Sequence, residues 1–274
     1  MTGISSLRTQ ATFMSAATVI GCAVVLPPAL YILYTSVKGP DFSLDAFNEV
    51  LSSTLFWHSL ATTLYIAGLS SILSLILGFV VALHLARQPV RRRAFFLLLV
   101  LLPFWTSVLV KCFALTIILG RNGIINSLLS CIFGTEINLP LIFNLVGTLI
   151  GMTNYLVPLV VFPVLASLLA IDRAIYHAAS IMGAKPARIF WTVTVPMSLP
   201  GLFAALIGIF VMSLGSFIVP ALLGGSGDMM LSNLVDFYNR EVLDWPKASA
   251  ISVVLLTVAI ILAASVAPRC QQKV

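Results

Sequence analysis

The chain has 274 residues, of which 60% are hydrophobic and only 9% are charged. A soluble domain carries about 25% charged residues, so this chain lacks the groups that would let water solvate its whole surface. Its formal net charge is +6, but no polar stretch is long enough to form the basic face that nucleic acid binding needs. The composition therefore indicates a membrane protein and excludes an ordinary soluble or nucleic-acid-binding domain.

Six apolar stretches reach the length of roughly 20 residues that a bilayer span needs. We expect helices, because lipid offers no hydrogen-bond partners to backbone groups and these runs lack the polar alternation of a barrel strand. The first stretch is longer than the apolar part of a typical signal peptide, so we take it as a retained span. The sequence thus predicts an all-α membrane protein, a single transmembrane domain over residues 1–274. Its six predicted transmembrane helices cover residues 13–34, 59–85, 94–119, 141–169, 201–223 and 248–267.

The basic residues are distributed unevenly between the loops. With six spans, ten of the 15 Lys and Arg residues fall on one side, and eight of the nine acids fall on the other. The positive-inside rule makes the basic side cytoplasmic, so both termini are expected in the cytoplasm. The ten basic residues are Arg8, Arg87, Arg91, Arg92, Arg93, Arg173, Lys185, Arg188, Arg269 and Lys273.

Lys111 is essentially the one ionisable residue expected inside a span. A proton- or sodium-coupled carrier usually needs an intramembrane carboxylate, and no Asp or Glu lies near the middle of a predicted span. Lys111 has two interpretations: a place in a transport pathway, or a side chain that reaches the headgroups from the outer end of its span.

Neither a metal site nor a nucleotide site is expected in this chain. The four cysteines and three histidines are scattered and follow no metal-ligand or disulfide spacing. The glycine-rich run 224–227 lacks the Lys-Ser/Thr ending of a phosphate-binding loop. ATP and magnesium, if they are used, are therefore expected at a partner protein.

The last outer loop gathers acids and aromatic residues, which are Asp228, Asp236, Phe237, Tyr238, Glu241, Asp244 and Trp245. Such residues could attract a cation or contact a delivery protein. They could equally be the ordinary acidic balance of an outside loop. We carry Asp236, Tyr238, Glu241 and Trp245, with Lys111, as candidate pathway or outer-loop contacts.

The most structured loop lies between the fourth and fifth predicted spans, at IYHAASIMGAKPARIFWTVTVPMSLPG. Ala178 and Ala179 put small side chains on a short helix, which Gly183 can end in a left-handed conformation. Pro186 suits the first turn of a second, amphipathic helix. Pro196 and Pro200 are expected to break that helix before the next span. This helix–turn–helix could insert as a rigid element into a cleft on another protein.

This pattern resembles the cytoplasmic EAA loop of ABC importer permeases. In that family a Glu-Ala-Ala triplet is followed by a Gly and then by a distal Pro. Here the triplet is His177-Ala178-Ala179, the glycine is Gly183, and the prolines are Pro196 and Pro200. His177 departs from the usual Glu, which puts in doubt any salt bridge made by that acid.

The resemblance extends over nearly the whole chain, which is similar to permeases of the spermidine/putrescine type. The matching runs are Leu102–Ser107, Lys111, Asn122–Asn126, Tyr155–Pro158, Phe162–Pro163, Ser216–Pro220, Leu223–Gly225, Trp245–Pro246, Ala248 and Ala250. The resemblance implies a type I ABC importer permease fold, with a cytoplasmic coupling helix–loop–helix over about residues 170–200.

The resemblance also implies partners and a location. The chain would be a multi-pass protein of the bacterial inner membrane, surrounded by lipid, and would form half of a pore with a second permease subunit. ABC ATPase subunits would bind inside, and a periplasmic solute-binding protein would deliver the solute. Polyamine is the favoured solute, with phosphonate, iron or another small solute as alternatives. A secondary carrier or channel is less favoured, because the chain lacks the buried carboxylate that an ion-coupled carrier usually needs. A membrane-embedded enzyme is less favoured, because the chain shows no catalytic cluster.

Overall fold

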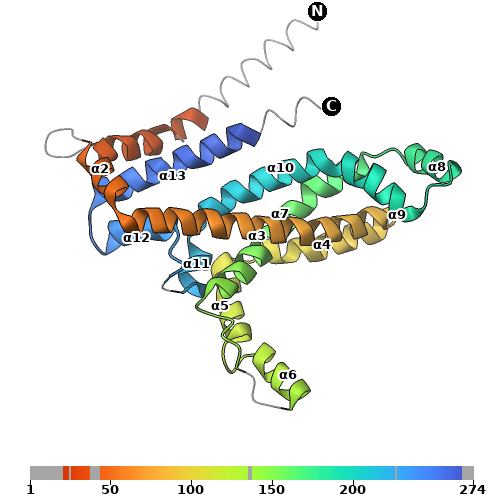
Figure 1. The fold of residues 1–274 in the computed structure, drawn as a ribbon, viewed down its shortest axis with the longest axis horizontal. Coiled ribbons are helices and arrows are strands. Elements are labelled where there is room, and N and C mark those ends of the chain that lie inside the picture. Colours follow the sequence, from red (N-terminus) through yellow and green to blue (C-terminus); the bar gives the residue numbers. More distant parts are fainter. Residues whose placement is uncertain (1–20, 25, 38–43, 135–137, 226, 267–274) are drawn as a thin grey trace, which may run out of the picture. The chain divides into compact units, whose positions relative to one another are not determined.

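The computed structural model describes residues 21–24, 26–37, 44–134, 138–225 and 227–266, and in these residues it contains helices and no strand (Figure 1). The helices are α2 (Asp45–Ser52), α3 (Thr54–Arg87), α4 (Val90–Trp105), α5 (Val108–Leu119), α6 (Ile124–Phe133), α7 (Leu145–Leu169), α8 (Arg173–Ile181), α9 (Pro186–Ile189), the π-helical turn η1 (Phe190–Thr194), α10 (Val195–Leu214), α11 (Ile218–Leu223), α12 (Leu231–Arg240) and α13 (Trp245–Val266). The all-α prediction is confirmed for this part of the chain. By internal contacts the chain forms two compact units, Met1–Thr54 with Val235–Leu256, and Leu55–Leu234 with Thr257–Val274.

Within the described residues, five helical stretches are long and apolar enough to cross a membrane. They are Thr54–Arg87, Val108–Phe133, Leu145–Leu169, Pro186–Leu214 and Trp245–Ala264. A shorter apolar helix, Gly21–Val37, overlaps the predicted span 13–34, of which residues 13–20 and 25 lie outside the described residues.

The predicted span 94–119 is not one helix, which corrects the sequence interpretation. α4 ends at Trp105 and α5 begins at Val108, with Thr106 extended between them. Pro103 lies in the last turn of α4, and its carbonyl accepts the backbone N–H of Thr106 at 3.3 Å and the Thr106 hydroxyl at 2.7 Å. Because proline removes one helical N–H bond and the threonine then closes a local turn, the helix ends here.

The predicted span 201–223 also consists of two helices. α10 ends at Leu214, the chain turns at Gly215, and α11 follows. The helical path that leads into α10 begins well before residue 201, at Pro186. The apolar pattern locates this stretch in the chain but does not show the turn inside it, because a turn covered by other helices can be as apolar as a helix.

The core of the larger unit is built around α7. Its residues from Leu156 to Leu168 pack against Ala82 and Leu85 of α3 and against Ala205 and Ile209 of α10. Glycines make these approaches possible: a Cβ at Gly78 would lie 2.6 Å from the Cβ of Val160, and a Cβ at Gly201 would lie 2.6 Å from the Pro163 carbonyl. The closely packed α3, α7 and α10 thus form the frame that positions the segments at their ends.

Polar side chains add links between elements of the same unit. The Ser70 and Ser213 hydroxyls lie 3.2 Å apart and join α3 to α10. The Thr63 hydroxyl accepts the N–H of Leu231 at 2.8 Å, which joins α3 to the start of α12. Satisfied polar contacts of this kind fix the packing of helices that are otherwise apolar.

The smaller unit holds an ion-pair cluster. The Lys247 ammonium lies 2.6 Å from a Glu49 carboxylate oxygen of α2 and 3.1 Å from an Asp244 carboxylate oxygen. The Ser249 hydroxyl donates to the Thr35 hydroxyl at 3.0 Å. These contacts tie α2 and the helix before it to the first turns of α13.

Candidate functional site

α8 follows directly on the last turn of α7. The Asp172 side chain caps it by accepting the N–H of Ala174 at 2.9 Å, so the sequence sets the start of the helix. His177 and Ala178 are exposed, whereas Ala179 is buried. The three residues of the predicted triplet therefore share one short helix but not one face.

Gly183 ends α8 in a closed turn. Its φ is 75°, in the left-handed region that favours glycine. The N–H of Ala184 donates to the Ala179 carbonyl at 3.1 Å, and the N–H of Gly183 donates to the Ser180 carbonyl at 3.0 Å. These two bonds are those of a Schellman motif, which satisfies the last carbonyls of the helix and fixes the direction in which the chain leaves it.

Pro186 occupies the first turn of α9, as its place in the sequence predicts. Pro196 and Pro200 do not break the helical path, which corrects that expectation. The wide turn η1 places the N–H of Val195 on the Phe190 carbonyl, so Pro196 falls in the first turn of α10, where a missing N–H is tolerated. Pro200 lies inside α10 without ending it.

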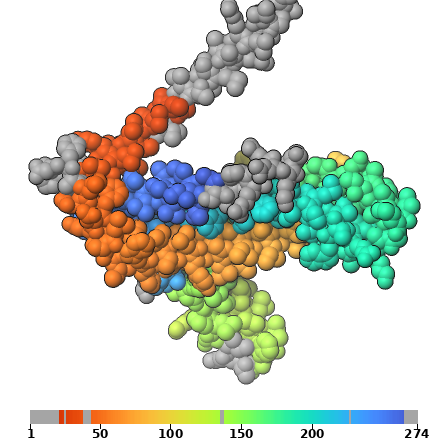
Figure 2. Space-filling model, turned by 45° about the horizontal axis from the view of Figure 1, so that its top comes forward, coloured from red at the N-terminus to blue at the C-terminus, as the bar shows by residue number. Residues whose placement is uncertain are grey.

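The helix–turn–helix, which we define as residues 172–194, has an attached face and a free face. On the attached face the Tyr176 hydroxyl lies 3.3 Å from the Thr194 hydroxyl, which links α8 to η1. On the free face Ile181 is 86% exposed, Met182 80% and Trp191 68%. Figure 2 shows this segment, in green and cyan, at one end of the larger unit. Large apolar residues gathered at an exposed turn are typical of a surface that another protein covers.

Basic side chains surround this same end of the larger unit. A cavity of about 800 Å³ lies behind the helix–turn–helix, and its lining includes Arg87, Arg93 and Arg173. The guanidinium group of Arg93 donates to the Gln88 carbonyl at 3.0 Å. The ends of α3, α4, α7 and α10 lie here with α8 and α9 (Figure 1). The structure thus brings together two of the basic loops that the charge pattern assigned to one side.

The other predicted site residues do not form one site. Lys111 lies in the first turn of α5, half-buried. In the smaller unit, Asp236 pairs with Arg240 at 2.7 Å, Glu241 is exposed, and Trp245 is 53% exposed. The Tyr238 ring packs edge-on against Phe237, with centroids 5.6 Å apart. Asp236 is paired with Arg240 and Asp244 with Lys247, so these two carboxylates are less available to attract a cation than their place in the sequence suggests.

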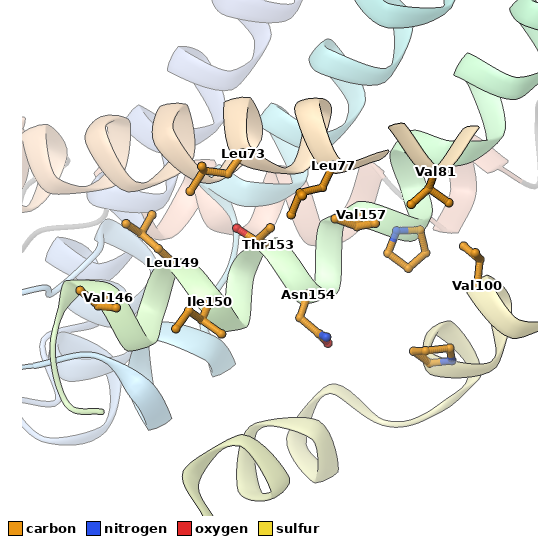
Figure 3. Close-up of a pocket in the computed structure, with 12 residues that line it drawn as sticks. Leu73, Leu77, Val81, Val100, Val146, Leu149, Ile150, Thr153, Asn154 and Val157 are labelled. Carbon is orange, nitrogen blue, oxygen red and sulfur yellow. The ribbon is translucent and has the colours of Figure 1, made fainter. Parts of the chain in front are cut away.

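The sequence analysis missed two polar residues in α7. Thr153 and Asn154 line a mainly apolar cavity of about 640 Å³ between α3, α4 and α7. In Figure 3 Thr153 lies on the side of α7 that faces Leu73 and Leu77 of α3, and Asn154 points away from α3. The Thr153 hydroxyl is buried without a hydrogen-bond partner, and Asn154 is exposed in the middle of the helix. The sequence signal was an asparagine within an apolar span, which a search for ionisable residues overlooks.

The arrangement is that of a helical membrane protein with an exposed helix–turn–helix at one end of its larger unit. No group of three or more potential metal ligands occurs in the described part of the chain. The family model for the inner membrane component of binding-protein-dependent transport systems matches residues 74–271. The chain belongs to this family. It is therefore a transport component of an inner membrane, as the sequence predicted.

Relatives cover most of the chain. The spermidine/putrescine transport system permease protein PotB of Escherichia coli (strain K12) is 28% identical over 251 residues, which are 88% of this chain and 91% of that protein. The inner membrane ABC transporter permease protein YdcU of the same organism is 32% identical over 84% of this chain and 77% of that protein. A putative 2-aminoethylphosphonate transport system permease protein, PhnU of Salmonella typhi, is 26% identical over 84% of this chain and 80% of that protein.

Solved structures share the fold. A chain of a bacterial ABC transporter that imports the acidic polysaccharide alginate matches with a TM-score of 0.76 at 18% identity, over 98% of this chain and 97% of that one. A chain of the MetNI methionine ABC transporter matches with a TM-score of 0.61 at 18% identity, over 81% of this chain and 98% of that one. The predicted ABC importer permease fold is confirmed at this level.

Proposed function

We propose that the chain is the permease subunit of an ATP-driven importer and forms half of a solute pore with a second permease subunit. Residues 1–274 act as one transmembrane domain, in which the first predicted span, residues 13–34, adds to the five described. Both termini lie in the cytoplasm. ATP and magnesium bind to a partner ATPase, and a periplasmic solute-binding protein delivers the solute from the other side. Family membership and the apolar helices support this assignment.

The observation that carries the proposal is the helix–turn–helix. It combines a fixed turn at Gly183, an apolar free face at Ile181 and Met182, and a continuous helical connection through η1 into α10. A displacement of the free face is therefore transmitted through a continuous helix to the packed helices α7 and α10, because no flexible loop lies between them. ATP binding at the partner would favour one arrangement of the coupled assembly, and the spans would follow as rigid bodies.

His177 determines what kind of contact this segment can make. It is exposed on α8, where the resemblance places a glutamate in related permeases. A histidine side chain has no carboxylate with which to form a salt bridge to a basic residue of the partner. Binding would then rest mainly on apolar burial at Ile181 and Met182, which is worth about 1.5–3 kcal/mol for each fully covered side chain.

Polyamine is the solute that we propose. The names of the PotB relatives, which match over most of the chain, support it, and the PhnU relative supports 2-aminoethylphosphonate as the second candidate. Asp236 and Asp244 are each paired with a basic residue of this chain, so these two acids are less available to a cation, and we assign solute choice mainly to the delivery protein. Uptake of labelled spermidine and of labelled 2-aminoethylphosphonate, in cells with and without this chain, decides between them.

Alanine at Gly183 tests the coupling role. A side chain there meets no atom within 4 Å, but the φ of 75° makes any residue other than glycine strained, by about 1–2 kcal/mol. We expect Gly183→Ala to lower solute uptake severalfold while the protein still inserts, because the direction of the turn changes. Gly183→Asn should restore much of the uptake, since asparagine tolerates this conformation.

Gly134 provides the matched control. It ends α6 with a φ of 65°, and a Cβ added there would also meet nothing within 4 Å, so Gly134→Ala introduces the same backbone strain elsewhere. We expect that variant to transport almost normally. Equal uptake by Gly183→Ala and Gly134→Ala would show that the turn at Gly183 has no special role.

A further inference from the structure

The turn between α3 and α4 holds a basic cavity that shares no lining residue with the cavity behind the helix–turn–helix. Its volume is about 670 Å³, and it is lined by His84, Gln88, Arg91, Arg92, Phe95 and Phe96. No carboxylate is among these residues, and neither arginine takes part in an ion pair with any residue that the structure describes. Two arginines that line one cavity without a carboxylate partner favour an anion, and their planar guanidinium groups suit phosphate.

An apolar groove continues from this basic cavity. A second cavity, of about 410 Å³, shares His84 and Phe96 with it and is otherwise lined by aliphatic residues of α3 and α4. Two of these, Val81 and Val100, also line the large apolar cavity that reaches Leu73 (Figure 3). The three cavities therefore form one path along α3 and α4, which is basic at one end and apolar over the rest.

The length of this path fits the acyl chain of a lipid. From Leu73 to His84, two α3 residues that line opposite ends of the path, the helix rises by about 17 Å, because each helical residue adds about 1.5 Å. One leaflet of a bilayer has a hydrocarbon depth of about 15 Å, half of the whole core. No residue of α4 is buried, and its lining residues Phe95 and Leu99 are 59% and 48% exposed, so the groove is open on the α4 side.

The chemistry of the groove excludes the proposed solute and favours a membrane component. A polyamine is a cation, which the arginines repel and the apolar walls cannot solvate. A phospholipid with an anionic headgroup presents a phosphate to the arginines and a chain to the aliphatic walls. The cytoplasmic leaflet, on which the positive-inside rule places this turn, is the anionic one.

We propose that the groove between α3 and α4 is a binding site for an anionic phospholipid, with the phosphate at Arg91 and Arg92 and an acyl chain along Val81 and Val100. The proposal rests on the membership in an inner-membrane family and on the predicted orientation, and not on the coupling role of the helix–turn–helix. A defect in coupling and a defect in lipid binding are therefore separate results.

The test uses the full chain reconstituted in phosphatidylcholine vesicles that contain one tenth phosphatidylglycerol, then released in mild detergent for native mass spectrometry. We expect phosphatidylglycerol to stay bound in excess over its share of the vesicle. Replacing both arginines, Arg91→Gln with Arg92→Gln, should weaken its retention by about 30-fold, since each basic residue near a lipid surface contributes about 1 kcal/mol. Arg91→Lys with Arg92→Lys keeps the charges and should retain most of the binding.

Arg121→Gln is the matched control, because Arg121 is an exposed arginine in the turn between α5 and α6 and lines none of these cavities. Retention that falls equally in this control and in the double variant would overturn the proposal. Displacement of the lipid by free glycerol phosphate would overturn it in favour of a soluble phosphate ester. A mass for two copies of the chain without lipid would overturn it in favour of a second protein that covers the groove.

Discussion

α7 and the helix–turn–helix of residues 172–194 are neighbours in the sequence, and both are rich in apolar residues. They differ in how much of those apolar side chains is exposed. In α7, Leu156 and Val160 have no exposed surface, because α3 and α10 cover them. In the helix–turn–helix, Ile181 and Met182 keep 86% and 80% of their surface exposed. Hydrophobic composition alone predicts neither outcome.

The difference lies in what surrounds each region. The apolar residues of α7 are covered by the chain itself, through glycines that let neighbouring helices approach. The helix–turn–helix borders a cavity lined by Arg87, Arg93 and Arg173, and the described part of the chain leaves Ile181 and Met182 largely uncovered. We therefore expect another protein to cover these exposed apolar side chains, and we propose that this protein is the ATPase.

The largest effect is expected from filling the space between α7 and α10. Gly201→Leu places a side chain against the Pro163 carbonyl, which is backbone and cannot move aside cheaply. We expect little folded protein in the membrane, since overpacking alone costs about 1–3 kcal/mol. The measurement is the amount of monodisperse protein after detergent extraction. Gly208→Leu, in the same helix with nothing within 4 Å of a Cβ, should accumulate normally.

A large effect on transport, without a loss of folded protein, is expected at the free face of the turn. Met182→Asp puts a charge where we propose that the ATPase covers an apolar side chain. Uptake should fall at least tenfold, because burying an unpaired carboxylate costs several kcal/mol. Val90→Asp is the matched control, since Val90 is 77% exposed and lies outside the helix–turn–helix. Normal uptake by Met182→Asp would mean that this face stays uncovered.

A moderate effect, on the yield of folded protein, is expected at Asn154, a polar residue of α7 that lines an apolar cavity. Asn154→Leu should leave folding unchanged or improve it, because a polar group is removed from that cavity. Because we propose that a lipid chain and not the solute occupies this cavity, uptake of labelled solute should stay near its normal rate; a severalfold fall would place Asn154 on the solute path and contradict the lipid assignment. Phe162→Leu, at another exposed position of α7, should transport normally. Unchanged uptake in both variants would assign Asn154 to a contact with lipid, as we propose.

The smallest effect is expected in the last outer loop. Arg240→Gln removes the pair with Asp236, which involves a highly exposed arginine and is worth at most about 1 kcal/mol. Thermal unfolding should shift only slightly, and uptake should stay near its normal rate. A marked rise in the uptake of a cationic solute would show instead that the freed carboxylate attracts it.

The sequence was sufficient for the all-α class of fold and for the approximate place of the apolar stretches, because both follow from composition and run length, but it did not give the bounds of every span. It also predicted the conformation of Gly183 and the place of Pro186, which are local preferences of single residues. It misjudged Pro196 and Pro200, because a π-helical turn places the first of them where a proline is tolerated. It could not reveal the break after Pro103, which needs the Thr106 side chain to close the turn, or the position of Asn154 in a cavity formed by three helices.

The central claim is that an ATPase covers the free face of the helix–turn–helix, and a photoreactive amino acid in place of Met182 tests it most directly. The full chain is irradiated in its native membrane, and the cross-linked protein is identified by mass spectrometry. Leu98, which is 61% exposed on α4, serves as the control position. The account predicts a cross-link from position 182, and not from position 98, to a cytoplasmic ATP-hydrolysing subunit. Cross-links from position 182 only to lipid or to this chain itself would contradict it.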